Sequence, residues 1–593
     1  MTLSSKTDCN PSDIAIKSLF LGPQSENGDW FCSAVMRVLE NTVKWRKSLF
    51  PGDGKAISLE DQSDPEFLKL RSHLESSLDE LLRRLEGEQP KFTPRYIGHM
   101  VSETTLPALL AEFALLLHNP NNASPEVAKV GAQLETEAIA ALSEMLGFLP
   151  NRARGHFTSG GTLANFEAVW RALHRFDKNL ALALYLIDQN ALPETDLFNL
   201  MHLSNARYDA LFMQHGVLPE RLAPYSILNC GRWSLKIPSQ IQKINLSPIL
   251  LVPSNKHYSW PKAALVFGLG LESFWQVRLD AEGRLDTEDL RFKIEKAQAE
   301  SRPILMIVSV AGTTEMGEVD PIEKIQDLLD QHTDLSFWHH VDAAYGGFFA
   351  AVLRGEKQNQ AAGLGATTLT SLGALGRVSS ITIDPHKLGY IPYACGAFIA
   401  RDEDHYVSPR IAAPYLKADS PQANWSTTLE GSRSAAGAAA IWLTFQTLGF
   451  NGTGFGRILS KTVEAKNLFR SHLEKIDGVC LVDPSDTNIV CFTVAQHHQT
   501  LTSVNRRAKA LFDLIESGPE FSVTRTILQR SAYEKLIARF CLQYSIVDDG
   551  SDLFLLRLVL MNPFICSQNM KTDFAQNFAS EIASALKTNL EHS

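Results

Sequence analysis

The sequence lacks several features that mark whole classes of protein. It has no uninterrupted apolar run of about 18 or more residues, so no segment is expected to span a membrane. It has no run of lysine and arginine, and its net charge of −10 at pH 7 argues against nucleic acid or an anionic membrane as a partner. Its eight cysteines include no C-x-x-C pair, which favours free thiols in a reducing compartment over disulfides or a metal site.

Other absences narrow the location and the architecture. The polar stretch 1–10 has no apolar core of a signal peptide, so we expect a cytoplasmic protein. No internal repeat or low-complexity tract is visible. With 593 residues, 45% of them hydrophobic, the chain is long enough for a large core and for two or three domains.

The most informative stretch is Asp384-Pro385-His386-Lys387, which follows a β-branched run, 378–383, that predicts a strand. The run 337–341 predicts another strand, with Asp342 at its end. Ligands of open α/β sheets bind where strand ends converge. A lysine and an aspartate there suit pyridoxal 5′-phosphate (PLP), because the lysine forms a Schiff base with the aldehyde and the carboxylate keeps the pyridine nitrogen protonated. A solvated lysine after a strand, beside a common Asp-Ala-Ala sequence, is the plainer alternative.

A small-residue turn at 155–165 precedes apolar residues with helical spacing at 166–173. Glycines let the backbone approach a ligand closely, a helix N-terminus offers free N–H groups, and Ser159 and Thr162 add hydroxyls. The turn therefore predicts a phosphate cradle. It has neither the lysine of a nucleotide P-loop nor the G-x-G-x-x-G of a dinucleotide site. The alternative is an ordinary glycine turn with a Ser/Thr helix cap.

His257 lies in K-H-Y-S-W, after the apolar run 248–252. A histidine ring at a strand end can stack on a pyridine ring and donate a hydrogen bond. The chain has 17 histidines, so a loop histidine without a role is the alternative for any one of them. His257 is singled out by its position between the phosphate turn and Asp342.

The order S-G-G-T, H-Y-S, H-V-D-A-A-Y-G-G, D-P-H-K resembles that of the group II PLP-dependent amino-acid decarboxylases, over about residues 95–565. K-H-Y-S-W-P-K-A-A, H-V-D-A-A-Y-G-G and I-T-I-D-P-H-K-L-G-Y-I-P-Y are most similar to bacterial tyrosine decarboxylases. The resemblance implies an α/β protein of the aminotransferase-like type (fold type I). Its large domain would hold a mainly parallel seven-stranded sheet, between an N-terminal helical segment and a small C-terminal α+β domain.

The resemblance also implies a role for individual residues. Lys387 would bond the cofactor, Asp342 would face its ring nitrogen, and His257 and Ala344 would cover the two ring faces. Tyr415, in the polar segment 409–425, resembles the catalytic-loop tyrosine by which the partner chain protonates Cα in the family. The residues expected to contact the cofactor are Ser159, Gly160, Gly161, Thr162, Asn165, His257, Thr314, Asp342, Ala344, Asp384, His386 and Lys387.

Arg557 interrupts the apolar run 554–560, which predicts a strand. A lone charge there is costly unless it is paired, and an edge arginine that reaches solvent is the alternative. F-L-L-R-L-V-L-M-N-P is similar to the family's C-terminal segment, whose arginine binds the substrate α-carboxylate. The segments 95–100 and 117–122 resemble substrate-pocket loops, so His99 and Asn121 are expected at the substrate as well.

The implied reaction is decarboxylation of an L-amino acid to its amine, with tyrosine or a related aromatic acid as the first candidate. The long stretch 177–247 resembles an insertion of the bacterial tyrosine branch. Asn562, where that branch often has threonine, is more similar to glutamate decarboxylases, and Cys395 also departs from the branch. Glutamate or aspartate is therefore the alternative substrate. More distant alternatives are another PLP lyase, such as a desulfurase that uses Cys395, and an inactive binding protein.

Three segments are expected along the chain: an N-terminal helical segment (1–100), a PLP-binding large domain (101–440) and a small α+β domain (441–593). Asp64-Pro65 opens a helix with an apolar stripe from Phe67 to Leu85, which lies either at the interface of a homodimer with shared active sites or on the chain's own core. Residues 1–60 are expected to be loop-rich. Further predictions are helices at 126–146, 198–212 and 441–448, and strands at 304–310, 478–484 and 488–493.

Overall fold

The larger sheet of the protein carries the elements that the motifs predict. The computed structural model describes residues 12–355, 363–408 and 426–588. In these ranges seven strands form one sheet in the order β1-β7-β6-β5-β4-β2-β3. The neighbours from β6 to β3 pair in parallel, and β7 runs antiparallel to both β1 and β6, which confirms the mainly parallel α/β sheet. The strands are β1 Arg154–Thr158, β2 Ile249–Pro253, β3 Phe274–Val277, β4 Ile304–Val310, β5 His339–Asp342, β6 Ser380–Ile383 and β7 Gly396–Ala400.

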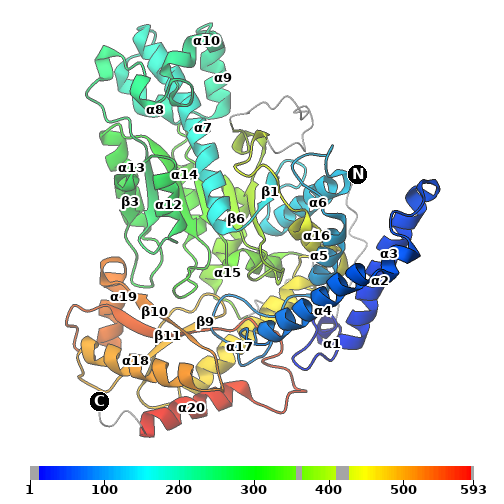
Figure 1. The fold of residues 1–593 in the computed structure, drawn as a ribbon. Helices are drawn as coiled ribbons and strands as arrows, with labels where there is room; N and C mark the ends of the chain where they lie inside the picture. Colours follow the sequence, from blue (N-terminus) through cyan, green and yellow to red (C-terminus); the bar gives the residue numbers. More distant parts are fainter. Residues whose placement is uncertain (1–11, 356–362, 409–425, 589–593) are drawn as a thin grey trace.

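Helices cover both faces of this sheet (Figure 1). Leu250 of β2 packs in a cluster with the long helix α7 (Gly161–Asp188), and Leu251 packs on the opposite face with α13 (Thr287–Ala299) and α14 (Ile322–Asp330). Successive side chains of a strand point to opposite faces, so a strand covered on both faces must be apolar throughout. This is why the apolar run at 304–310 predicted β4 to the residue.

Three helices pack together beside the sheet: α5 (Leu106–His118), α6 (Lys129–Leu146) and α16 (Ala436–Leu448). α6 was predicted from residue 126 and begins at Lys129. α16 was predicted from residue 441 and begins five positions earlier, because its first turns are small residues, A-G-A-A-A, that carry no apolar periodicity.

The stretch 189–247 folds as short helices around the far end of α7 (Figure 1). They are α8 (Leu197–Met201), α9 (Asn205–Gln214), α10 (Pro219–Leu222) and α11 (Ile227–Cys230). The helix predicted over 198–212 is interrupted between α8 and α9. Ser204 breaks it, because its side chain caps α9 by accepting the N–H of Arg207 at 3.3 Å.

A second sheet lies in the C-terminal part of the chain, in the order β10-β11-β9-β8, with antiparallel pairing throughout the described residues. Figure 1 shows α18 and α20 beside it. The predicted strands near 479, 489 and 554 are all present. The elements are α17 Phe455–Leu473, β8 Val479–Leu481, β9 Ile489–Val494, α18 Leu501–Ser517, β10 Thr524–Leu528, α19 Arg530–Gln543, β11 Leu553–Val559 and α20 Phe574–Thr588.

The N-terminal part is more helical than its sequence indicated. α1 (Asp13–Lys17) is followed by α2 (Gly28–Leu49), a 22-residue helix where loops were expected. The sequence did not single out α2, which buries only Ala34 in the single chain. α3 (Leu59–Ser63) leads to α4 (Pro65–Leu85), which begins as predicted, with Asp64 accepting the N–H of Glu66 at 2.8 Å.

The helices described in the structure include none that is both long and apolar enough to cross a membrane.

Candidate active site

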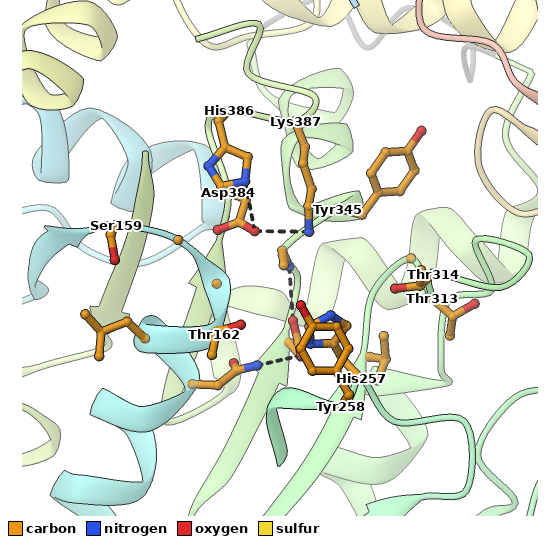
Figure 2. Close-up of a pocket in the computed structure, with 18 of the residues that line it drawn as sticks. Ser159, Thr162, His257, Tyr258, Thr313, Thr314, Tyr345, Asp384, His386 and Lys387 are labelled. Carbon is orange, nitrogen blue, oxygen red and sulfur yellow. Dashed lines mark hydrogen bonds and ion pairs between the residues drawn. The ribbon is translucent and has the colours of Figure 1, made fainter. Parts of the chain in front are cut away.

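The predicted cofactor residues come together in one cavity. It has a volume of about 460 Å³ and opens where β2, β4, β5 and β6 end (Figure 2). Every residue expected to contact the cofactor lines it: Ser159, Gly160, Gly161, Thr162, Asn165, His257, Thr314, Asp342, Ala344, Asp384, His386 and Lys387. Segments up to about 230 positions apart in the chain thus meet as the strand-end rule requires.

The glycine turn forms one wall of the cavity. β1 ends at Thr158, and α7 starts at Gly161 with its N-terminus at the cavity. A Cβ on Gly161 would lie 2.7 Å from Oδ2 of Asp384, and a Cβ on Gly396 would lie 2.5 Å from Cα of Gly160. A side chain at Gly396 would clash with the backbone of Gly160, and one at Gly161 would displace the carboxylate of Asp384. The unpaired N–H groups of the helix end make this wall an anion cradle.

Lys387 is paired with Asp384 inside the cavity. Its Nζ lies 3.0 Å from Oδ2 of Asp384, and Nε2 of His386 lies 3.5 Å from the same oxygen (Figure 2). Burial lowers the pKa of the Lys387 ammonium group, but the charge and hydrogen bond of Asp384, together with the charge of Asp342, outweigh burial and raise it. The lysine is therefore stored as a cation beside a carboxylate.

Asp342 is held in place by two donors on one oxygen. Its Oδ2 accepts Nδ2 of Asn165 at 2.8 Å and Nε1 of Trp260 at 3.2 Å. The same Asn165 amide also donates to Oγ of Ser259 at 3.0 Å and faces Nε2 of His340 at 3.3 Å. Asn165 therefore orients the carboxylate through a fully used amide group.

His257 is oriented by Ser259. Nδ1 of the ring lies 2.9 Å from Oγ of Ser259 and accepts the backbone N–H of the same residue at 3.3 Å. Burial lowers the pKa of His257, and the charge of Asp342 opposes this without reversing it. The neutral ring therefore carries its proton on Nε2.

The arrangement fits PLP on structural grounds. It offers a partly buried amine for the aldehyde, a fixed carboxylate for the ring nitrogen, a histidine ring whose Nδ1 accepts a hydrogen bond, and a glycine cradle for the phosphate. Residues 235–495 match the family model described as the pyridoxal-dependent decarboxylase conserved domain. Residues 235–495 of the chain therefore carry a pyridoxal-dependent decarboxylase domain.

Relatives of the decarboxylase extend the match over nearly the whole chain. An L-tyrosine decarboxylase of Levilactobacillus brevis is 29% identical, over 99% of this chain and 98% of the relative. An L-aspartate decarboxylase of Thermococcus kodakarensis is 29% identical, over 70% of this chain and 85% of the relative. The crystal structure of Oryza sativa TDC with PLP and tryptamine has a TM-score of 0.60 at 15% identity, covering 95% of this chain and 98% of that one, and so shares the fold.

The decarboxylase also uses residues that the sequence did not single out. Ser259 and Trp260 orient His257 and Asp342. Both belong to the motif K-H-Y-S-W, in which the sequence assigned a role to the histidine alone. Asn255 and Tyr345 line the cavity as well. The Tyr345 hydroxyl donates to Oδ1 of Asn488 at 2.5 Å, a contact across 143 positions that no local pattern reveals.

The residues expected at the substrate lie apart from the described lining of the cavity. Arg557 is buried, donates from Nε to Oγ1 of Thr524 at 3.1 Å, and bonds the carbonyl of Thr314, so it adjoins the cavity wall. Burial and the charge of Arg557 lower the pKa of His99, which places His99 near the guanidinium group.

Two further substrate and catalytic expectations have different outcomes. The side chain of Asn121 is engaged elsewhere: it donates to Oγ of Ser432 at 3.0 Å and accepts the N–H groups of Ala123 and Arg433, both at 3.1 Å. Tyr415 lies outside the described residues.

Proposed function

We propose that this decarboxylase converts an aromatic L-amino acid, with L-tyrosine as the first candidate, to its amine and carbon dioxide. The observation that carries the proposal is the pairing of Lys387 with Asp384 at 3.0 Å in a cavity that also presents Asp342 and His257. When bound, PLP supplies an electron sink for the bond that breaks at Cα. L-tyrosine follows from the near full-length similarity to L-tyrosine decarboxylases.

In this proposal each residue of the cavity has a distinct task. Lys387 would hold the cofactor through its side-chain amine, which Asp384 keeps in place at 3.0 Å. Asp342 would favour a proton on the ring nitrogen by its charge, and His257, whose Nδ1 accepts the N–H of Ser259, would contact the ring. Ser159 and Thr162, with the N-terminus of α7, hold the phosphate. Arg557 binds the substrate α-carboxylate from beside the wall at Thr314.

The two residues that depart from the tyrosine branch lie outside the described lining of the cavity. Asn562 donates to the carbonyl of Phe92 at 2.8 Å and accepts the N–H of Phe564 at 2.9 Å, so it shapes a turn. Cys395 is buried against Gly437, and burial raises its thiol pKa well above the usual value. A buried thiol of this kind argues against a desulfurase. Neither departure therefore counts against an aromatic substrate.

An assay of amine release across the twenty L-amino acids tests the substrate. We expect tyrosine to give the highest kcat/KM. A higher value for aspartate or glutamate would transfer the proposal to the acidic alternative, which the similarity to the Thermococcus kodakarensis L-aspartate decarboxylase keeps in view. Release of amine from none of the twenty would overturn it.

We further propose that Tyr415 delivers the proton to Cα after carbon dioxide leaves. A phenol can hand over a proton and a phenyl ring cannot, so Tyr415→Phe should slow amine formation by about a hundredfold or more. Binding of cofactor and substrate should remain, since neither needs the hydroxyl. Product analysis under air should show aldehyde and hydrogen peroxide in place of part of the amine. Amine as sole product at the native rate would assign the proton to another group, with His257 next.

We also propose a homodimer with shared active sites in a reducing, cytoplasmic location. The apolar stripe of α4 stays uncovered in the single chain: Leu70 is 71% exposed and Leu74 is 66% exposed. α2 adds exposed apolar side chains, among them Trp30 and Trp45. Large apolar side chains exposed in such number mark association surfaces. The cysteines described in the structure are all free, as a reducing compartment favours.

The double variant Leu74→Asn with Leu78→Asn should weaken this dimer. Two leucines that lose their burial cost about 3 kcal/mol together, which is about a hundredfold in the dissociation constant. Sedimentation velocity over a concentration series measures the shift. Ser76→Asn, on the polar face of the same helix, is the matched control and should leave the dimer intact. A native chain that is active as a monomer would contradict the dimer itself.

A further inference from the structure

The cavity wall formed by residues 312–314 is held from behind by Glu318. The Glu318 carbonyl accepts the N–H groups of Gly312 at 2.9 Å and Thr313 at 3.1 Å. The Thr313 hydroxyl donates to Oε2 of Glu318 and accepts the N–H groups of Gly317 and Glu318, each at 3.2 Å. A threonine hydroxyl has one proton, and in Thr313 that proton is donated to Glu318. Glu318 thus sets the position of the wall through both its backbone and its side chain.

The other carboxyl oxygen of Glu318 faces Tyr533, which comes from α19 in the C-terminal part of the chain. A Cβ on Gly283 would lie 2.9 Å from Oε1 of Glu318 and 3.3 Å from Cε1 of Tyr533, so these groups are packed together. Asn255, which lines the cavity, donates to the Gly283 carbonyl at 3.1 Å. The Tyr533 hydroxyl lies near the Glu318 carboxyl group and the Asn255 amide: burial is the main cause that raises its pKa, and both neighbours affect it.

The cluster of Glu318, Asn255 and Tyr533 lacks one hydrogen-bond donor if Glu318 is ionised. In the described part of the chain, Oε1 of Glu318, Oδ1 of Asn255 and the Tyr533 hydroxyl are all buried without a well-aligned hydrogen bond. The hydroxyl can donate to only one of the other two oxygens. A proton on Glu318 supplies the missing donor while Oε2 continues to accept from Thr313.

The surroundings also favour the neutral carboxyl group. Glu318 has no exposed surface, and burial, followed by the charge of Glu315, raises its pKa well above the usual range. The negative charges of Asp486 and Asp320 raise the pKa of Glu318 further. Arg284, a nearby cation, donates two hydrogen bonds to Asp486, at 2.9 and 2.8 Å. No cation forms an ion pair with Glu318 within the described residues. The other titratable or charged groups around this cluster are Asp280, Cys491 and Arg557.

We propose that Glu318 is a positioning residue for the cofactor cavity. Glu318 must keep a proton in order to connect the wall at residues 312–314 with Tyr533 and Asn255. The inference rests on the proposed cofactor cavity. Its consequence is a pH dependence of cofactor binding that comes from a side chain outside the cavity. Ionisation of Glu318 leaves a buried carboxylate that can only accept hydrogen bonds. The hydrogen bond from Glu318 toward Tyr533 is then lost, and the wall at residues 312–314 is no longer held by the cluster.

The sign of the pH dependence follows from proton linkage. A carboxyl group that is neutral when folded binds more protons in the folded state than in the unfolded state above its ordinary pKa. Its contribution to stability is therefore complete below the ordinary carboxyl pKa and is lost as the pH rises through the raised value. Cofactor affinity should fall over the same rise in pH.

The test uses pyridoxine 5′-phosphate, a probe that lacks the aldehyde and so cannot react with Lys387. Its dissociation constant is measured by fluorescence titration from mildly acidic to alkaline pH, together with thermal unfolding of the same samples. In the native chain the constant should rise by up to about tenfold per pH unit once Glu318 ionises. Glu318→Gln keeps one donor and one acceptor with no proton to lose, so it should bind as the native chain does at neutral pH and lose less affinity than the native chain as the pH rises. Burial raises the pKa of Glu315 and that of Asp320 to about 7, and these two groups still ionise in both proteins.

Two controls separate this role from plain packing. Glu318→Ala should bind about tenfold more weakly than the native chain at neutral pH, since its partners are left unpaired. Glu295→Gln, on the exposed face of α13, should follow the native curve. Parallel pH curves for the native chain and Glu318→Gln would overturn the inference while leaving the cofactor cavity in place. Absence of probe binding in every variant, including the native chain, would overturn the cavity as well.

Discussion

Lys387→Ala is expected to lower the rate of amine formation at least about 10⁴-fold, the scale on which enzymes lose activity when a covalent catalytic group is removed. The methyl group left at this position cannot form the bond to the aldehyde or be exchanged for the substrate amine. The visible absorbance of the lysine-bound cofactor should disappear in the same variant. Turnover near the native rate with that absorbance retained would show that another residue holds PLP.

The ion pair with Asp384 gives Lys387→Ala a second expected effect, on thermal stability. Removing the ammonium group leaves the Asp384 carboxylate buried without its cation at 3.0 Å, so Lys387→Ala should also unfold at a lower temperature. Lys387→Arg keeps a cation for Asp384 but offers no reactive amine at working pH. We expect the arginine variant to recover thermal stability and to remain inactive. Lys262→Ala, an exposed lysine on α12 (Ser259–Val266), controls for loss of charge alone.

Local pattern was sufficient for the parts of the site that lie on buried strands. β4 was predicted to the residue because a strand covered on both faces leaves an unbroken apolar run. The same rule placed Asp342 and Lys387 at neighbouring strand ends. Glycines 160 and 161 followed from the need for a close approach of the backbone, which the 2.7 Å spacing between a Cβ on Gly161 and Asp384 explains.

The contacts that orient these residues were beyond local pattern. Asn165 and Asp342 are 177 positions apart and meet only when α7 crosses the sheet. Glu318 lies just after β4 of the larger sheet, and Tyr533 lies on α19 in the C-terminal part of the chain. The raised pKa of Glu318 depends on burial by both parts, which no single segment of the sequence reveals. The helix α2 lacks the start signal that marked α4: Asn27 makes no side-chain cap hydrogen bond and no proline opens the helix, whereas Asp64 and Pro65 open α4.

Asp342→Asn is the second variant with a large expected effect. It should separate the contribution of the carboxylate's charge from that of its hydrogen bonds. Asn165 and Trp260 both donate to one oxygen of Asp342, at 2.8 and 3.2 Å. An asparagine can present its carbonyl oxygen to these two donors, so the local hydrogen bonds largely survive. What is lost is the negative charge beside the ring nitrogen, and an amide cannot hold a proton there.

We therefore expect Asp342→Asn to fold with a nearly native unfolding temperature and to decarboxylate about a hundredfold to a thousandfold more slowly, the usual loss when one preorganised electrostatic partner is removed. Asn165→Ala is the matched control, because it removes the donor at 2.8 Å and keeps the charge. Its rate should fall less than that of Asp342→Asn although its unfolding temperature falls more. Single-turnover measurements with saturating substrate isolate the step. An unchanged rate constant in Asp342→Asn would mean that the ring nitrogen is served by another group, and the carboxylate would then be a structural element of the His257, Ser259 and Asn165 network.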